Sequence, residues 1–371
     1  MIRRIGFVLL ILVLFISCGN RNQNEIREPV RSRTVNQVLE HGRNTFITNR
    51  RNPMSWGHNQ TIYVFADREA WHAVEPLLRY SLERSFFTTE NETLFDIVHG
   101  DIERINHFFR FRNLIFIGDL SSNEPVSQYI NRVMTEQALD SVRQRGASMF
   151  MNLNPWANDQ LVMFFIGDNT HNLRYFMLEN NDVYFQIFKD RFVARAHWQS
   201  QRVRGLRDSF FQGLPFTIYI PETYRVFRRD LENNFISFIW RSRNDQTHNP
   251  DLYISIYWEF VDENPLDDDW LVNKRAEIAW KYHDEDEFDP DAVTRGLMDF
   301  NGREAWFVSG AWQNRKHFMG GAFRAYAFWD EDLKTVYMID TSVYFPAGNK
   351  LRHLIDMEGY AKTIVPRRVG L

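Results

Sequence analysis

Asn113-Leu114-Ile115-Phe116-Ile117-Gly118-Asp119 is an apolar, β-rich run that ends in a small residue and an aspartate. The same design occurs at residues 61–67 and 161–168. Near-continuous apolar runs of this length are typical of strands that are buried on both faces of a sheet. Helical spacing follows each run, as in the stripe Trp71, Val74, Leu77, Leu78 and Leu82. Strand followed by helix, three times, predicts an α/β half over residues 59–200.

The rhythm of the sequence changes after Phe216. Short strand-like runs follow one another, separated by turn-forming clusters such as Asn301-Gly302; they lie at 216–220, 235–240, 252–258, 305–309, 322–328 and 336–345. Helices are expected at 267–281, where three aspartates suit the positive end of a helix dipole, and at 350–364. This pattern predicts an antiparallel sheet backed by two helices over residues 212–366, and an α+β fold class for the whole chain.

Asp67, Asp119 and Asp168 end the three runs of the first half. If the strands are parallel neighbours, these carboxylates lie along one carboxyl edge, where open α/β sheets usually bind ligands. Clustered carboxylates can hold a divalent cation or share acid–base work. Aspartate directly before a helix is also a preferred N-cap, worth about 1 kcal/mol. Capping is the favoured interpretation, and an acidic site is the alternative.

The first residues have the pattern of a secretory signal. Arg3 and Arg4 precede an apolar run at 5–16, and Ser17 and the chain's single cysteine, Cys18, follow it. This order of basic, apolar and small residues predicts a signal peptide over residues 1–17, and the run is shorter than the roughly 20 apolar residues of a membrane span. The polar stretch at 18–58 is expected to be a flexible tether. One cysteine excludes an internal disulfide framework and any CxxC zinc or redox module.

Phe15-Ile16-Ser17-Cys18 resembles the lipobox of bacterial lipoproteins, although Phe15 replaces the commoner leucine. The resemblance implies that Cys18 is lipidated and becomes the mature N-terminus. Several acyl chains, at about 0.8 kcal/mol per buried methylene, hold a protein stably on a bilayer. Gly19 follows the cysteine without an aspartate. By resemblance to lipoprotein sorting, this implies the outer membrane, facing the periplasm.

A second resemblance covers the folded part, at about residues 58–365. It rests on the segments 216–221 with Tyr224, 301–303 with Trp312, 318–323 with Tyr326, and 343–346, and on 112–117 with the Trp71 helix. Together these resemble the envelope lipoprotein family known as domain of unknown function 4837. The chain reads Thr88-Thr89-Glu90 where the family has a Pro-Gln pair, which puts a role for that loop in doubt. The resemblance implies lipidation and a two-part organisation, and it implies no catalytic residues.

Aromatic residues crowd the second half and suggest a binding surface. Trp312 and Phe318 flank Gly320-Gly321, which reads either as a backbone packed closely against a neighbour or as the floor of a ligand or peptide site. Core filling is the default for most of the 57 aromatic side chains. The acidic run at 283–291 fails the EF-hand pattern, because Phe288 takes a ligand position, and is expected to be a solvated loop. Isolated histidines such as His72, His99 and His107 favour no zinc site.

Composition narrows the classes of function. With 44 basic and 48 acidic side chains, the net charge of −4 argues against a nucleic-acid binder. No GxSxG elbow, P-loop or GxGxxG is present, and no cofactor, metal or catalytic residue is expected. The leading hypothesis is a non-catalytic, lipid-anchored envelope protein that is structural or binds an envelope protein or glycan through its second half. The alternatives are a carboxylate-dependent envelope hydrolase that uses Asp67, Asp119 and Asp168, and carbohydrate binding by exposed tryptophans.

Overall fold

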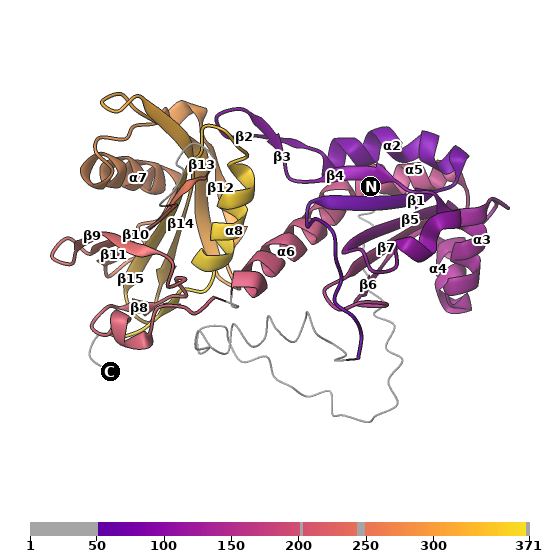
Figure 1. Ribbon diagram of the computed structural model, residues 1–371, viewed down its shortest axis with the longest axis horizontal. Coiled ribbons are helices and arrows are strands. Elements are labelled where there is room, and N and C mark those ends of the chain that lie inside the picture. Colours follow the sequence, from indigo (N-terminus) through magenta and orange to yellow (C-terminus); the bar gives the residue numbers. More distant parts are fainter. Residues whose placement is uncertain (1–50, 201–202, 243–248, 369–371) are drawn as a thin grey trace, which may run out of the picture. The chain divides into compact units, whose positions relative to one another are not determined.

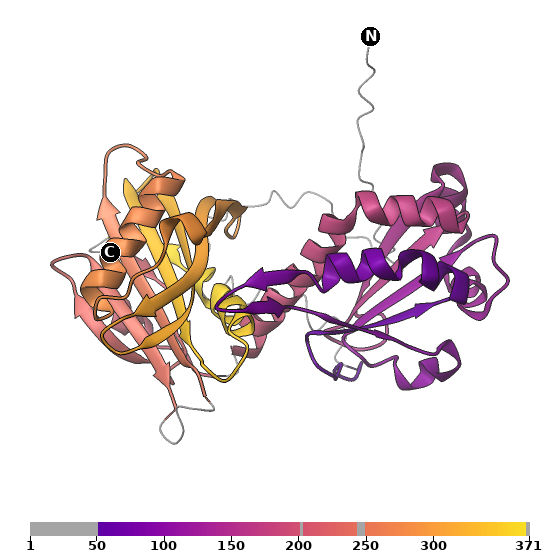
Figure 2. The same ribbon diagram turned by 90° about the horizontal axis from the view of Figure 1, so that it is seen from above.

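The computed structural model describes residues 51–200, 203–242 and 249–368. The expected signal peptide at 1–17, Cys18 and most of the tether at 18–58 lie outside the described residues. The described chain forms two compact units, one of residues 51–84 and 95–191 and one of residues 85–94 and 192–368 (Figures 1 and 2). Each unit is built around its own sheet.

The first unit contains a five-stranded sheet in the order β4-β1-β5-β7-β6. The three apolar runs form its centre, and their strands are parallel neighbours as predicted, with Phe65 beside Phe116 and Phe116 beside Phe164. The sequence pattern did not indicate the two outer strands: β4 is parallel to β1, and β6 is antiparallel to β7. The strands are β1 (Thr61–Ala66), β4 (Asp96–His99), β5 (Asn113–Asp119), β6 (Ala147–Leu153) and β7 (Leu161–Gly167).

Helices cover both faces of this sheet, which is why its central strands are apolar on both sides (Figure 1). The α3 face carries Phe65, Phe116 and Phe164, which pack against Tyr129 and Ile130 of α3. On the opposite face, Phe165 contacts Tyr184 of α6 edge to face. The helices that begin in this unit are α2 (Arg68–Leu82), α3 (Pro125–Val133), α4 (Glu136–Arg145), α5 (Thr170–Glu179) and α6 (Asn181–Ser200), with the 3₁₀ turn η2 (Ile102–His107).

The second unit contains the expected antiparallel sheet, with seven strands in the order β12-β13-β14-β15-β11-β10-β9. Its two-residue alternation separates the faces: Tyr326 and Phe328 lie in one core, whereas Phe323 and Ala325 lie in the other. The strands are β9 (Arg225–Asp230), β10 (Phe235–Arg241), β11 (Asp251–Phe260), β12 (Thr294–Asp299), β13 (Glu304–Asn314), β14 (Met319–Asp330) and β15 (Thr335–Tyr344).

The two predicted helices of this unit lie on opposite faces of the sheet (Figure 1). Helix α7 (Asp268–Tyr282) begins where expected, because the Asp267 carboxylate accepts the amide of Trp270 at 2.6 Å. Helix α8 (Leu351–Ala361) packs Leu354 and Met357 against the other face. The smaller elements are η3 (Asp208–Phe211) and η4 (Pro290–Ala292).

Two short pairings in the second unit differ from the sequence expectation. The run 216–220 forms only the two-residue strand β8 (Phe216–Thr217), paired with β16 (Val365–Pro366), and the Tyr219 amide donates to the hydroxyl of Thr363 instead. The hairpin of β2 (Ser85–Phe87) and β3 (Asn91–Thr93) belongs to this unit although it precedes β4 of the first. Its Glu92 is buried and accepts the amides of Lys350 at 2.9 Å and of Leu351 at 2.6 Å. The hairpin that contains Glu90 therefore supplies Glu92, whose carboxylate caps the N-terminus of α8.

Candidate functional site

The three strand-end aspartates lie at the carboxyl edge of the first sheet. Asp67 precedes α2, but its carboxylate caps a different helix, accepting the amides of Val126 and Ser127 in α3 at 2.7 and 2.8 Å. Glu124 precedes α3, and its carboxylate accepts the amide of Arg68 in α2 at 2.8 Å. Each helix is therefore capped by the residue that introduces the other. This crossed arrangement satisfies amides that a helix N-terminus leaves open.

Asp119 and Asp168 are also engaged in the scaffold. One oxygen of Asp119 accepts the amide and the hydroxyl of Ser121, and the other accepts the hydroxyl of Thr170 at the start of α5. One oxygen of Asp168 accepts the side-chain amides of Asn169 and Asn172. The three carboxylates thus fasten helix N-termini and loops to the sheet edge.

The three aspartates do not share the cavity that Asp67 lines. Asp67 lines a shallow cavity of about 420 Å³ with His99, Asp101 and Glu124, whereas Asp119 and Asp168 do not line it. In the described part of the chain, no group of three His, Cys, Asp or Glu side chains is placed to hold a metal ion. Of the three, only Asp67 caps a helix, and it caps α3 instead of the helix that follows it. Asp119 and Asp168 bond to side chains and to a turn amide, and the cap of α5 is Asn169.

The four residues proposed as a ligand site in the second half are also separated. Trp312 of β13 lies directly opposite Gly321 of β14 and is 5% exposed. A Cβ at Gly321 would come within 2.8 Å of the Trp312 ring and 2.0 Å of the carbonyl oxygen of Val343. The glycine is therefore needed so that the indole can lie across the backbone. Trp312 fills the space that a ligand floor would require.

Phe318 lies away from this contact. It stands in the turn between β13 and β14 with a φ of 53° and is 94% exposed, whereas Gly320, two residues later, is already part of strand β14. The Gly-Gly pair is thus strand rather than loop. Of the four residues, Trp312 and Gly321 form a packing pair, and Phe318 projects from the hairpin.

The acidic run is only partly solvated. His283 and Asp286 are each 9% exposed, and the ring of His283 lies 3.1 Å from the hydroxyl of Ser255. Burial, followed by the charges of Arg275 and Arg228, lowers the pKa of His283 to about 3, so the imidazole stays neutral. Burial also raises the pKa of Asp286 to about 6. Because Ser255 and His283 are both enclosed, this pair is a buried hydrogen bond within the core.

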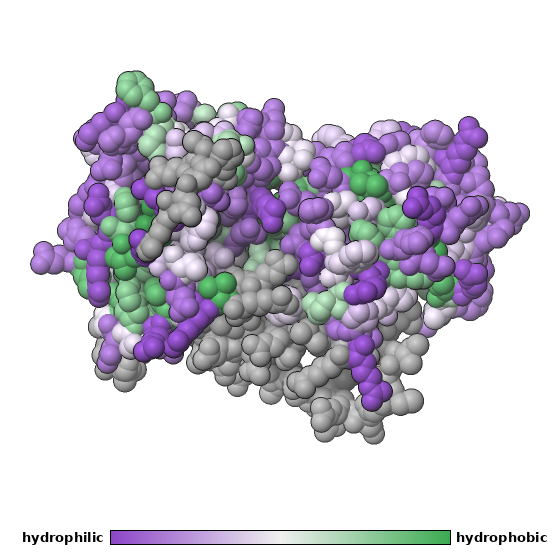
Figure 3. All heavy atoms as spheres, viewed as in Figure 1, coloured by the Kyte–Doolittle hydropathy of each residue, from purple (hydrophilic) through white to green (hydrophobic). Residues whose placement is uncertain are grey.

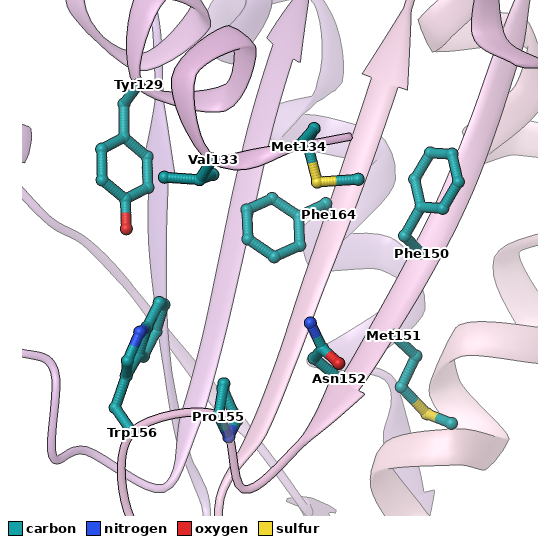
Figure 4. A pocket seen from close by; sticks show the side chains of 9 residues that line it. All are labelled: Tyr129, Val133, Met134, Phe150, Met151, Asn152, Pro155, Trp156 and Phe164. Carbon is teal, nitrogen blue, oxygen red and sulfur yellow. The ribbon is translucent and has the colours of Figure 1, made fainter. Parts of the chain in front are cut away.

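An apolar pocket in the first unit was not indicated by any sequence motif (Figure 4). It has a volume of about 200 Å³ and lies where α3 ends over β7 and the edge strand β6. Helix α3 stops because Met134 takes an extended backbone with ψ of 150°. The pocket is lined by Tyr129, Val133, Met134, Phe150, Met151, Asn152, Pro155, Trp156 and Phe164. Apolar residues reach the surface of the first unit (Figure 3), and at this pocket Val133 is 42% exposed.

Two polar groups accompany the apolar lining of this pocket. The Tyr129 hydroxyl points toward Trp156, and the Asn152 amide is turned toward the ring of Phe164 (Figure 4). Neither side chain has a hydrogen-bond partner among the described residues. Burial raises the pKa of Tyr129, so the hydroxyl keeps its proton and can donate. A largely apolar cavity with a few convergent polar groups is the usual form of a small-molecule site.

The pocket residues come from separate elements, which explains why sequence patterns missed them. Tyr129 and Val133 are four residues apart on α3 and share a helix face, whereas Phe150 and Asn152 share a face of β6. Strand β6 was not predicted, so the second pair had no place in the expected sheet. The available signal was the alternation at residues 147–153.

Two models of known protein families match this chain. Residues 204–363 match the family model described as Domain of unknown function (DUF4837), and residues 55–201 match a different one, Domain of unknown function (DUF8532). The expected family is confirmed in the second part of the chain, while 112–117 and the Trp71 helix fall within the other model. No curated protein matches the sequence. In the described residues, no helix has the length and apolar character needed to cross a membrane.

Two solved structures show distant likeness to this chain. The solution structure of cyanobacterial PsbP (CyanoP) from Synechocystis sp. PCC 6803 has a TM-score of 0.29 and 7% identity, covering 44% of this chain and 91% of that one. The crystal structure of LpqN, involved in cell envelope biogenesis of Mycobacterium tuberculosis, has a TM-score of 0.25 and 9% identity, covering 41% of this chain and 83% of that one. At these scores neither likeness bears on function.

Proposed function

Because residues 204–363 of this chain belong to the family of the domain of unknown function DUF4837, whose description states no activity, we propose a function from the chain's own residues. The protein is a lipid-anchored protein of the cell envelope that binds a ligand and does not catalyse a reaction. The observation that carries the anchor is the position of the single cysteine, Cys18, directly after an apolar run and Ser17. The residue that follows Cys18 is Gly19 and not an aspartate, which supports a location in the outer membrane, facing the periplasm.

The binding role rests on the contrast between two sites of the first unit. The strand-end carboxylates are occupied by helix amides and side chains, which supports a structural use for them. The apolar pocket has two polar groups that the described protein leaves unpaired. An engineered apolar cavity of about 150 Å³ binds benzene, so a volume of about 200 Å³ suits one aromatic ring or a short branched alkyl group. The Tyr129 hydroxyl and the Asn152 amide would contact a polar substituent on that group.

The anchor is tested by labelling growing cells with an alkyne analogue of palmitate. The wild-type protein is expected to take up the label and to sediment with membranes. Cys18→Ala removes the acylated atom, so the label is lost and the protein leaves the membrane fraction. Labelling that persists in Cys18→Ala would contradict the anchor.

The pocket is tested by titrating the full chain with small aromatic and branched-alkyl probes and measuring the heat of binding by isothermal titration calorimetry. Val133 lies at the rim and is 42% exposed, so Val133→Trp is expected to fill the pocket and weaken binding at least tenfold. Leu178→Trp is the matched control, because Leu178 is 49% exposed on α5 and lies outside the pocket. Equal binding by both variants would reject this pocket as the ligand site.

A further inference from the structure

A second cavity lies at one end of the seven-stranded sheet, within the second unit. It has a volume of about 240 Å³ and opens where the β12–β13 turn, the end of β14 and the loop before α7 meet. It is lined by Asn264, Leu266, Gly302, Arg303, Glu304, Trp306, Trp329 and Asp330. Its lining differs from the apolar pocket of the first unit, because indole rings here alternate with charged and amide groups.

Two indoles form the flat walls of this cavity. Trp306 of β13 is paired with Ala327 of β14, and Trp329 lies two residues further along the same strand. Side chains two residues apart share a face, so both indoles stand on the face of the sheet that α7 covers. Both keep part of their surface exposed, unlike Trp312, which is 5% exposed on the same face. The Nε1 of Trp329 is buried and has no hydrogen-bond acceptor among the described residues.

The polar groups are placed by tight turns. Asn301 and Gly302 have φ of 58° and 79°, and the amide of Phe300 donates to the carbonyl of Arg303 at 2.7 Å. These positive φ values are those of a two-residue hairpin turn, which places Glu304 at the cavity. The guanidinium of Arg303 lies on the other face of the sheet, 5.3 Å from the ring centre of Phe328. Asp330 follows Trp329 directly, so its carboxylate lies on the other face of the sheet, where Oδ1 accepts the amide of Leu333. On the face of the indoles, the exposed carboxylate of Glu304 has no partner within the described chain.

This combination of groups restricts the chemistry of a ligand. A purely apolar molecule would cover the carboxylate of Glu304 without pairing it, which is costly. An anion would meet the same carboxylate, and a cation would meet the amine of Lys334, which lies 5.1 Å from the ring centre of Trp329. A sugar ring satisfies all of them, since its C–H faces can lie on indoles while each hydroxyl both donates and accepts. The volume is smaller than the roughly 300–1,000 Å³ of pockets for drug-sized ligands, which suits one ring.

We propose that this cavity binds one pyranose ring of a neutral glycan. Trp306 and Trp329 contact the faces of the ring, and Glu304 accepts hydrogen bonds from its hydroxyls. Asn264 contributes its amide at the opposite rim. The site is separate from the lipid anchor and from the apolar pocket. The proposal for this site can therefore be wrong while the proposed function is right, and the reverse.

The experiment uses the full-length protein in a detergent that has no sugar head group. Three neutral trisaccharides serve as probes, namely triacetylchitotriose, maltotriose and cellotriose, and binding is measured by calorimetry and by tryptophan fluorescence. At least one probe is expected to bind saturably and to change the fluorescence. Glu304→Gln and Trp306→Ala are each expected to weaken that binding at least tenfold.

The control is Trp280→Ala, because Trp280 is a 58% exposed tryptophan on α7 outside the cavity. It is expected to bind like the wild type. Glu304 is exposed, so Glu304→Gln decides the test if Trp306→Ala does not fold. The proposal is overturned if no probe binds the wild-type protein, or if Glu304→Gln binds as tightly as the wild type.

Discussion

Gly321 has no side chain because Trp312 and a neighbouring strand occupy the space that one would need. An added Cβ would lie 2.0 Å from the carbonyl oxygen of Val343, which belongs to the sheet backbone and cannot turn away. At Gly320, one residue earlier, the nearest atom to an added Cβ is the carbonyl oxygen of Trp312 at 3.1 Å. Two adjacent glycines therefore carry very different constraints.

Gly321→Ala is expected to destabilise the protein by about 1–3 kcal/mol or more, because overpacking forces the backbone to shift. Gly320→Ala is the matched control and should cost clearly less, since only a small displacement relieves its contact. Urea unfolding followed by tryptophan fluorescence measures both. Equal losses for the two variants would contradict the role assigned to Gly321.

The carboxylate of Asp67, at the sheet of the first unit, is also held by specific neighbours. Asp67→Ala is expected to lower the free energy of unfolding by about 1–3 kcal/mol, because the amides of Val126 and Ser127 lose their acceptor in a buried place. Asp140→Asn removes only an exposed contact to Arg143 and should change stability by less than about 0.5 kcal/mol. A loss for Asp67→Ala no larger than that of the control would argue against the crossed caps.

At the scale of elements, helix α8 depends on a segment far from it in the chain. Its own N-cap residue, Lys350, makes no capping bond with its side chain, and the buried Glu92 of β3 takes that place. A carboxylate is well suited there, since the N-terminus of a helix carries partial positive charge. The hairpin β2–β3 is therefore a structural part of the second unit.

Glu92→Gln is expected to destabilise the second unit by about 1–3 kcal/mol, because the amide has one acceptor oxygen where two carboxylate oxygens bind Lys350 and Leu351. Glu90→Gln is the control, since the side chain of Glu90 is 66% exposed and reaches only the Lys350 amine. Thermal unfolding by circular dichroism compares them. If Glu92→Gln and Glu90→Gln have the same melting temperature, Glu92 does not have the capping role.

The same helix predicts a dependence of stability on pH. Burial raises the pKa of Asp356 to about 6, above the value near 3.9 of an unfolded chain. The folded state then holds the proton more tightly, so this group favours folding at low pH and loses that contribution as pH rises through about 6. Asp356→Asn removes the titration, and its stability relative to the wild type should rise between pH 4 and pH 7. Urea unfolding at both pH values checks this, and a difference that does not change with pH would refute it.

At the scale of the whole molecule, sequence patterns predicted the central parallel strands, the antiparallel second sheet and both of its helices. They did so because apolar runs and turn residues are local signals. The edge strands β4, β6, β9 and β12 were missed, since short, half-exposed strands carry little pattern. Asp67 was correctly placed at the sheet edge, but the helix that it caps depends on a contact 59 residues away. Both cavities combine residues from several elements, and the spacing of residues along the sequence does not predict such combinations.

The division into units also predicts how a fragment behaves. A chain of residues 192–371 lacks the hairpin, so the amides of Lys350 and Leu351 lose their buried acceptor. Hydrogen exchange at these two amides should be much faster in the fragment than in the full chain, while the centre of β14 keeps its protection. Equal protection of the two amides in both forms would contradict the assignment of Glu92 as the cap of α8.

The bond between Glu92 and Lys350 spans 258 residues. During synthesis the hairpin is made long before the helix that it caps, so the second unit can complete its fold only after α8 has been made. Contacts of such long range slow folding, because the intervening loop must be closed before the contact contributes. A chain that stops before α8 keeps its hairpin and its sheet face uncovered. Such incomplete products are expected to be degraded, whereas the finished protein is protected.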